Sequence, residues 1–117
     1  MVIRKKSPEA RHEHEGHRLF NRGRYEEAVI HFRNACKSSP NVTQNYVEYA
    51  NVLLKAYPSG EGRKKAISII HDMIPGRTNN ERFINEIRRV LREHGEMASV
   101  KAIENYIAKK DADMKKK

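Results

Sequence analysis

The sequence predicts an all-α protein of about six helices, packed as stacked antiparallel hairpins. Clusters rich in Pro, Gly, Ser and Asn interrupt the chain at five places and leave segments of roughly 12–17 residues, the usual length of a globular helix. Within each segment the apolar residues recur three or four positions apart, which is the period of a helix buried along one face. No segment shows sustained strand alternation.

The segments before and after the break at residues 21–23 form the first predicted hairpin. Ser7, Pro8 and Glu9 mark a helix start, because they supply an N-cap residue, a first-turn proline and an acid. Gly23 lies where the helix must stop and the chain must turn. The positions at helical spacing are Ala10, Gly16, Leu19 and Phe20 in the first segment, and Tyr25, Ala28, Val29, Phe32, Ala35 and Cys36 in the second.

The other four segments are divided by breaks at residues 38–41, 58–62, 75–80 and 94–95. Asn41 is predicted to cap the third helix and Asn80 the fifth, since asparagine is a preferred N-cap residue. Gly95 is predicted to end the fifth helix. The apolar positions are Tyr46, Tyr49, Ala50, Leu53 and Leu54, then Ala66, Ile67, Ile70, Met73 and Ile74, then Phe83, Ile84, Ile87, Val90 and Leu91, and finally Met97, Val100, Ile103, Tyr106 and Ile107.

The charge of the chain is concentrated at its two ends. Lys and Arg number 24 against 15 Asp and Glu, which gives a net charge of +9. Residues 1–7 supply +3 of this excess and residues 109–117 supply another +3. We therefore predict a basic N-terminal tail at residues 1–7, one helical domain at residues 8–108, and a basic C-terminal tail at residues 109–117.

The cysteine content and the apolar runs bear on the compartment. Cys36 is the only cysteine, so no internal disulfide is possible and no zinc spacing exists. The first residues contain no apolar stretch of the kind that a secretory signal needs, and no run approaches the roughly 18 apolar residues of a membrane span. These features predict a cytoplasmic protein, or a nuclear one, that does not insert into a membrane.

One segment carries a recognisable spacing at residues 16–40, set by Gly16, Leu19, Gly23, Tyr25, Ala28, Phe32, Ala35 and Pro40. This spacing resembles the tetratricopeptide repeat. Ala50 follows Gly16 at the 34-residue period of that family. The next small-and-large pair, Ala66 and Ile70, comes four residues late, which the loop at residues 58–62 explains. The resemblance implies three repeats at about residues 9–42, 43–78 and 79–112.

The third repeat departs from this spacing. Arg88 stands where the first repeat has Gly16, and Glu104 stands where it has Phe32. End repeats of solenoids are often atypical because one face meets water. A second, weaker resemblance to the mitochondrial fission adaptor Fis rests on residues 48–50, 63–67 and 74–75. That family ends in a membrane anchor, whereas this sequence ends in three lysines.

The tetratricopeptide resemblance implies a concave groove lined by the first helix of each hairpin. A partner peptide or helix would lie there, and Asn51 is the first candidate to bind its backbone, because an amide both donates and accepts. Glu13, His17 and Glu48 stand where chaperone-binding repeats need Lys and Asn, so no acidic chaperone tail is expected. The partner-binding residues that the resemblance implies are Glu13, His14, His17, Asn21, Gln44, Glu48, Asn51, Lys55, Asn85, Arg89 and Arg92, with Phe20, Val47, Arg82 and Glu86 beside them.

Catalytic and metal sites are not predicted. His14 and His17 lie three apart on one helix, but no complete ligand set accompanies them and His12 points elsewhere. Cys36 falls beside Phe32 on the apolar face, which favours a small core residue over a nucleophile. We therefore expect no catalytic residue, no metal and no cofactor.

These observations predict a protein-interaction adaptor or scaffold. One alternative is an RNA-associated protein, whose binding would be electrostatic. It would use the bases of the second half: Arg63, Lys64, Lys65, Arg77, Arg82, Arg88, Arg89 and Arg92. Another alternative is a small assembly or secretion chaperone, which needs an exposed apolar stripe. The only candidates for that stripe are Phe20, Val47 and Leu54.

Overall fold

Six helices make up the part of the chain that the structure describes. The structure is a computed structural model that describes the backbone of residues 8–115 and the side chains of residues 14–113. The predicted all-α class is confirmed, and no strand occurs within residues 8–115. The helices are α1 (Pro8–Asn21), α2 (Tyr25–Ser38), α3 (Thr43–Ala56), α4 (Gly60–Asp72), α5 (Glu81–Glu93) and α6 (Met97–Lys115).

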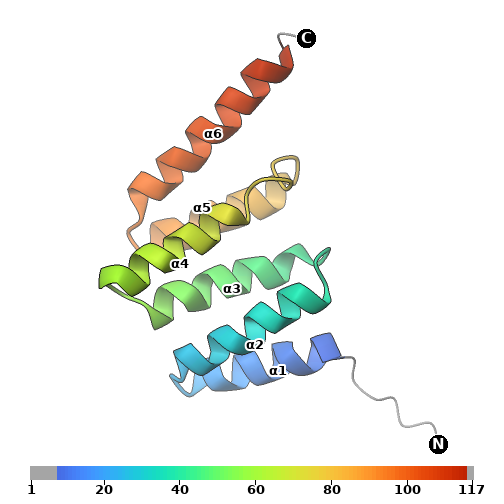
Figure 1. The fold of residues 1–117 in the computed structure, drawn as a ribbon, viewed down its shortest axis with the longest axis vertical. Helices are drawn as coiled ribbons and strands as arrows, with labels where there is room; N and C mark the ends of the chain where they lie inside the picture. The colour runs from blue at the N-terminus through green and yellow to red at the C-terminus, as the bar shows by residue number, and fades with distance from the viewer. Residues whose placement is uncertain (1–7, 116–117) are drawn as a thin grey trace, which may run out of the picture.

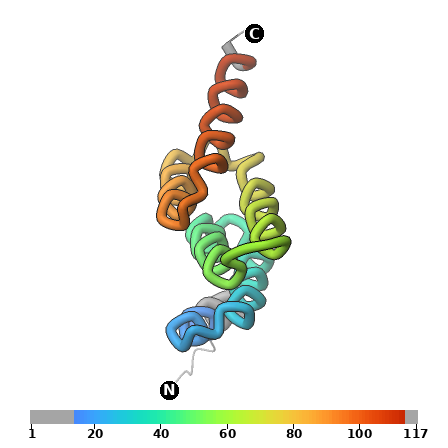
Figure 2. The backbone as a smooth tube through the Cα atoms, turned by 90° about the vertical axis from the view of Figure 1, so that its left-hand side faces the viewer, coloured from blue at the N-terminus to red at the C-terminus, as the bar shows by residue number. Residues whose placement is uncertain are grey.

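Successive helices pack as antiparallel hairpins in two layers (Figures 1 and 2). Helices α1, α3 and α5 form one layer, α2 and α4 form the other, and α6 rises obliquely beyond them. The extents of 58 × 37 × 18 Å describe a long, thin slab. Because one helix with its side chains is about 10 Å across, 18 Å is the thickness of two helix layers. We call the surface of α1, α3 and α5 the odd-helix face.

One continuous apolar core runs between the layers, from Leu19 on α1 to Ile103 on α6. The helical spacing predicts most of it, including the late pair Ala66 and Ile70, both fully buried. Asn45 on α3 is also fully buried, and its side-chain amide has no hydrogen-bond partner among the described residues. Such a group costs about 1–3 kcal/mol. The largest apolar side chains with almost no exposure are Phe32, Phe83, Leu53, Leu54, Ile70, Ile87, Leu91 and Ile103.

The turns confirm some predicted signals and correct others. Asn80 caps α5, and its side chain accepts a hydrogen bond of 3.0 Å from the backbone N–H of Phe83. Gly23 and Gly95 have φ values of 75° and 76°, a conformation that glycine adopts without strain. The prediction for Asn41 was wrong, because the N-cap of α3 is Val42 and no side chain caps it.

Two predicted boundaries differ from the structure. The break at residues 58–62 is shorter than expected, since α4 already begins at Gly60. The prediction that this loop explains the late pair Ala66 and Ile70 was wrong, because the link at residues 57–59 is as long as the link at residues 22–24, and Ala66 comes late mainly because it lies further into its helix. At the other end, α6 continues past residue 108 to Lys115, so most of the predicted C-terminal tail is helical. Residues 109–115 contain neither Gly nor Pro, and nothing in them stops the helix. The predicted N-terminal tail, residues 1–7, lies outside the described residues.

Arg63 of the second hairpin forms polar contacts with the third hairpin. Its side chain is only 14% exposed and pairs with Glu96 at 2.8 Å, in the turn before α6. It also donates to the carbonyl oxygens of Leu54 at 2.7 Å and His94 at 3.1 Å, which lie at the ends of α3 and α5. One guanidinium therefore satisfies helix-end carbonyls from two hairpins.

Candidate protein-binding face

The odd-helix face begins where α1 meets α3. His17 Nε2 lies 3.2 Å from Glu48 Oε1, and the imidazole ring meets the Phe32 ring edge-on at 5.2 Å between centroids. His14 and Asn21 are exposed on the same helix. The structure thus brings the predicted groove residues of α1 and α3 together. The side chain of Glu13 lies outside the described residues.

A recess of about 240 Å³ lies between α3 and α5. Val47 is buried beside it, while Gln44 and Arg82 are exposed at its edge. Gln44 and Val47 belong to the second predicted repeat and Arg82 to the third, so the recess brings together groove positions of two predicted repeats. We call it the α3/α5 recess; it is lined by Thr43, Gln44, Val47, Arg82, Phe83 and Glu86.

Asn51, the leading candidate from the sequence, is already bonded within the protein. Its Oδ1 lies 3.0 Å from His94 Nε2, which can donate to it at the end of α5. The pKa of His94 lies below its usual value of 6.5, because burial and then the charges of Arg63 and Lys55 disfavour the imidazolium. Only the amide NH₂ of Asn51 is therefore left to meet a partner. The sequence did not show this contact, since 43 residues separate its two sides.

The arginines of α5 already have carboxylate partners. Arg89 donates to Glu86 at 2.8 Å and to Glu93 at 2.7 Å, both on its own helix. Arg92 lies 3.6 Å from Glu104 and so faces α6. A partner carboxylate would have to displace these acids, which weakens the predicted role of both arginines. Asn85 and Lys55 remain exposed on the face.

Ion pairs within the protein also engage most of the basic cluster in the second half of the chain. Besides Arg89 and Arg92, ion pairs engage Arg63, Lys64 and Arg88. Arg77 stacks on Tyr46, with its Cζ 3.9 Å from the ring centroid. Within the described residues, most of the charge that the RNA alternative would use is therefore directed at the protein itself.

The apolar stripe that the chaperone alternative needs is not exposed. Leu54 is 1% exposed and Val47 is 4% exposed, so both belong to the core. Phe20 is half-buried and packs edge-on to Tyr25, with 5.2 Å between the ring centroids. These three residues were predicted to form an exposed stripe because helical spacing alone does not show which apolar residues the neighbouring hairpin covers.

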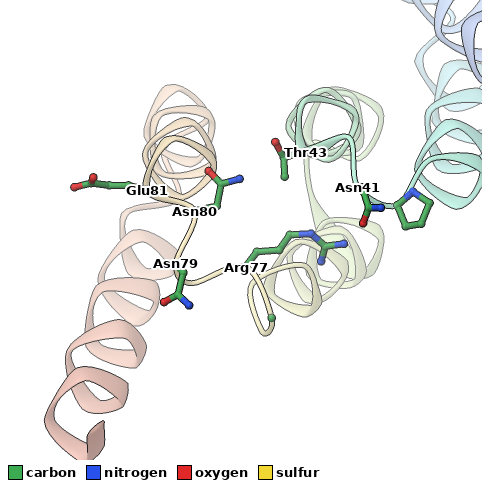
Figure 3. Close-up of a pocket in the computed structure, with 8 residues that line it drawn as sticks. Asn41, Thr43, Arg77, Asn79, Asn80 and Glu81 are labelled. Atoms are coloured by element: carbon green, nitrogen blue, oxygen red, sulfur yellow. The ribbon is translucent and has the colours of Figure 1, made fainter. Parts of the chain in front are cut away.

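One cavity was not predicted from the sequence. It has a volume of about 740 Å³ and lies where the loops before α3 and α5 approach each other. Figure 3 shows Arg77 reaching across it toward Asn41, while Glu81 points away. Thr43 lines both this cavity and the α3/α5 recess, so the two adjoin. We call it the loop-edge recess, lined by Pro40, Asn41, Thr43, Gly76, Arg77, Asn79, Asn80 and Glu81.

Cys36 is confirmed as a core residue. It is 5% exposed, and burial raises the pKa of its thiol to about 12. A thiol in that state is a poor nucleophile, because the thiolate is the reactive form. Among the side chains of residues 14–113, no group of three or more His, Cys, Asp and Glu lies close enough to hold a metal ion. None of the helices within residues 8–115 is long and apolar enough to cross a membrane.

The fold and the face define a class of protein: an all-α stack of three helical hairpins with a recessed, polar odd-helix face. Comparison with protein-family models, with curated proteins and with solved structures finds no match for this chain. The function therefore has to be argued from the face itself.

Proposed function

We propose that the protein is an interaction adaptor that binds a peptide or helix of another protein along its odd-helix face. The observation that carries this proposal is the pair of adjoining recesses, the α3/α5 recess and the loop-edge recess, which share Thr43. Together they give a partner chain a continuous path across the starts of α3 and α5. We also propose that the hairpins are tetratricopeptide-type repeats.

The chemistry of this path suits a polypeptide. Gln44, Asn41 and Asn79 carry side-chain amides, which can donate to a peptide carbonyl and accept from a peptide N–H. Val47 and Phe83 add an apolar floor to the α3/α5 recess. A few placed polar groups around an apolar floor is the usual composition of a binding cleft.

The spacing inside the hairpins supports the repeat part of the proposal. A Cβ atom at Gly16 would lie 2.9 Å from Phe32 Cε2, so these positions are in direct contact. Arg88 and Glu104, sixteen residues apart like Gly16 and Phe32, pair at 2.6 Å. The first and third hairpins thus bring equivalent positions together although their chemistry differs.

The proposal is tested by affinity capture from native lysate with the intact protein. The variant Gln44→Trp with Arg82→Glu changes two exposed positions at the edge of the α3/α5 recess. The matched control is Asn105→Trp with Lys101→Glu, which makes the same changes in size and charge at exposed positions of α6. We expect a captured protein to resist nuclease and about 0.5 M salt, to be lost with the first variant and to be retained with the control.

A different result would favour the RNA alternative. If capture disappears with nuclease or salt and both variants behave like the natural sequence, the odd-helix face is not the binding surface. Electrostatic binding to nucleic acid falls steeply as salt rises, which is why the salt arm separates the two functions.

A further inference from the structure

A third recess lies away from the odd-helix face, between α2, α3 and α4. It has a volume of about 270 Å³. Side chains from all three helices line it. We call it the α2/α4 recess, lined by Val29, Arg33, Tyr49, Leu53, Tyr57, Gly62, Lys65, Ala66 and Ile69.

The base of this recess is apolar. Val29, Leu53 and Ala66 are buried core residues, and Ile69 is half-buried at the edge. An apolar group placed here would extend the protein core rather than rest on a polar surface. Burying such a group gains about 25 cal/mol per Å² of apolar area.

The link between α3 and α4 forms one wall of the recess. Tyr57 is the C-cap of α3, and the short link at residues 57–59 leads from there to the start of α4 at Gly60. A Cβ atom at Gly62 would lie 3.1 Å from Tyr57 Cδ1. Glycine therefore lets the tyrosine ring pack directly against α4, and this contact closes that side of the recess.

Two cations flank the recess and have no acidic partner among the side chains of residues 14–113. Arg33 on α2 and Lys65 on α4 are exposed, and neither forms an ion pair with any described residue. Lys64, one position earlier, pairs with Glu61 at 3.1 Å. Burial raises the pKa of Tyr49, and the charge of Arg33 opposes this rise, so the guanidinium lies near the phenol.

The size of the recess limits what it can hold. Pockets for drug-sized ligands have volumes of about 300–1,000 Å³, and this recess is slightly smaller. It therefore fits one large side chain and its neighbouring backbone. Cations on both sides of an apolar base complement a ligand that is apolar at its centre and acidic at its edges.

We propose that the α2/α4 recess is a second binding site, which takes an acidic peptide segment with one aromatic or aliphatic residue at its centre. That residue packs on Val29, Leu53 and Ala66, and carboxylates on either side bind Arg33 and Lys65. The site is separate from the odd-helix face and does not depend on the adaptor proposal. It would let the protein hold two partners at once.

Nucleic acid fits this recess less well. Single strands bind through stacking platforms and a run of cations along the backbone. Tyr49 is only 7% exposed, so its ring face is covered, and the recess has two cations rather than a run. A short acidic peptide needs only those two charges and the apolar base.

The test is fluorescence polarisation with a labelled peptide whose core is Asp-Asp-Phe-Asp-Asp, titrated with the full chain at about 0.1 M salt. We expect saturable binding that weakens by about tenfold or more in Arg33→Glu and in Lys65→Glu, since each variant replaces an attraction by a repulsion. Lys64→Glu is the matched control, with the same charge change on the same helix, and should alter the affinity less than about twofold. A peptide with Ser in place of Phe should also bind about tenfold more weakly.

Each other outcome overturns the site. Equal losses in Lys64→Glu and Lys65→Glu would mean general attraction to a basic protein, and equal affinity for the Phe and Ser peptides would mean that the recess is not entered. Tighter binding of a labelled oligouridylate, lost in the same two variants, would assign the surface to nucleic acid. Binding that the Gln44→Trp with Arg82→Glu variant abolishes would place the peptide on the odd-helix face instead. All these positions are exposed, and circular dichroism checks that each variant folds.

Discussion

The first and third hairpins differ in the contact that joins their two helices. In the first, α1 and α2 interlock through Gly16 and Phe32, and a Cβ atom on the glycine would lie 2.9 Å from the ring. In the third, the equivalent positions are Arg88 and Glu104, which form an ion pair at 2.6 Å. An apolar contact allows two helices to approach closely, whereas two long charged side chains hold them apart.

The C-terminal half also differs in shape from the first hairpin. Beyond Ile103, side chains on α6 are mostly exposed, and the helix projects past the other five (Figure 1). The third hairpin is instead secured at its turn, where Arg63 binds Glu96 and the carbonyl of His94. The two ends of the molecule therefore depend on different forces, apolar packing at one and polar contacts at the other.

The largest expected effect lies in the first hairpin. Phe32→Ala should lower the free energy of unfolding by about 3–5 kcal/mol, because it leaves a cavity at a fully buried site. Glu104→Ala, at the equivalent position of the third hairpin, should cost less than about 1 kcal/mol, since its ion pairs are partly exposed. Urea denaturation followed by circular dichroism measures both. Equal losses would show that the two hairpins are held alike.

The second effect concerns the turn of the third hairpin. Arg63→Met should cost about 2–3 kcal/mol, because it removes the partner of Glu96 and of helix-end carbonyls that are partly buried. Hydrogen exchange should rise in α5 and α6 and stay unchanged in α1 and α2. The control is Lys64→Met, whose exposed pair with Glu61 contributes little. An even rise along the whole chain would contradict the local role of Arg63.

A smaller effect would come from converting one hairpin to the chemistry of the other. Arg88→Ala combined with Glu104→Phe restores a small residue opposite an aromatic one. We expect a gain of about 1–2 kcal/mol, because an apolar pair would bury area at a place where the partly exposed ion pair contributes little. Arg88→Ala alone should be destabilising, because Glu104 keeps only the longer contact with Arg92. Loss of stability in the double variant would show that α6 cannot move closer to α5.

The smallest effect is a dependence on pH at the end of α5. Burial and neighbouring cations hold the pKa of His94 below 6.5, so the native state resists protonation that the unfolded chain accepts. The stability from His94 is complete above pH 6.5 and declines as the pH falls from there toward the lower native pKa. His94→Gln should flatten this part of a stability profile. His14→Gln, at an exposed position of α1, is the matched control.

Much of the fold follows from local features of the sequence. Helical spacing located all six helices, and the Asn80 cap and the Gly23 turn were predicted because each depends on residues only a few positions away. The Asn41 cap failed because the loop places Val42 at the N-cap instead, a choice of backbone that one residue type does not fix. The length of α6 was underestimated because a charged sequence was interpreted as a tail.

The candidate site was less predictable than the fold. The resemblance grouped Gln44, Val47 and Arg82 on one face, and the structure places them around one recess. The resemblance did not show that His94 hydrogen-bonds to Asn51, or that Glu86 and Glu93 form ion pairs with Arg89, because these contacts depend on side-chain conformations. The loop-edge recess was missed for a similar reason: its two loops lie more than thirty residues apart in the sequence and meet only after the hairpins stack.

The most direct test of the central claim is photo-crosslinking with the intact protein. A photoreactive amino acid is placed at Gln44 or Arg89 on the odd-helix face, or at Lys101 on α6 as the control. The proposal predicts that one partner protein is crosslinked from Gln44 and Arg89 and not from Lys101. Crosslinking of that partner from Lys101 alone would contradict it and would move the binding surface to α6.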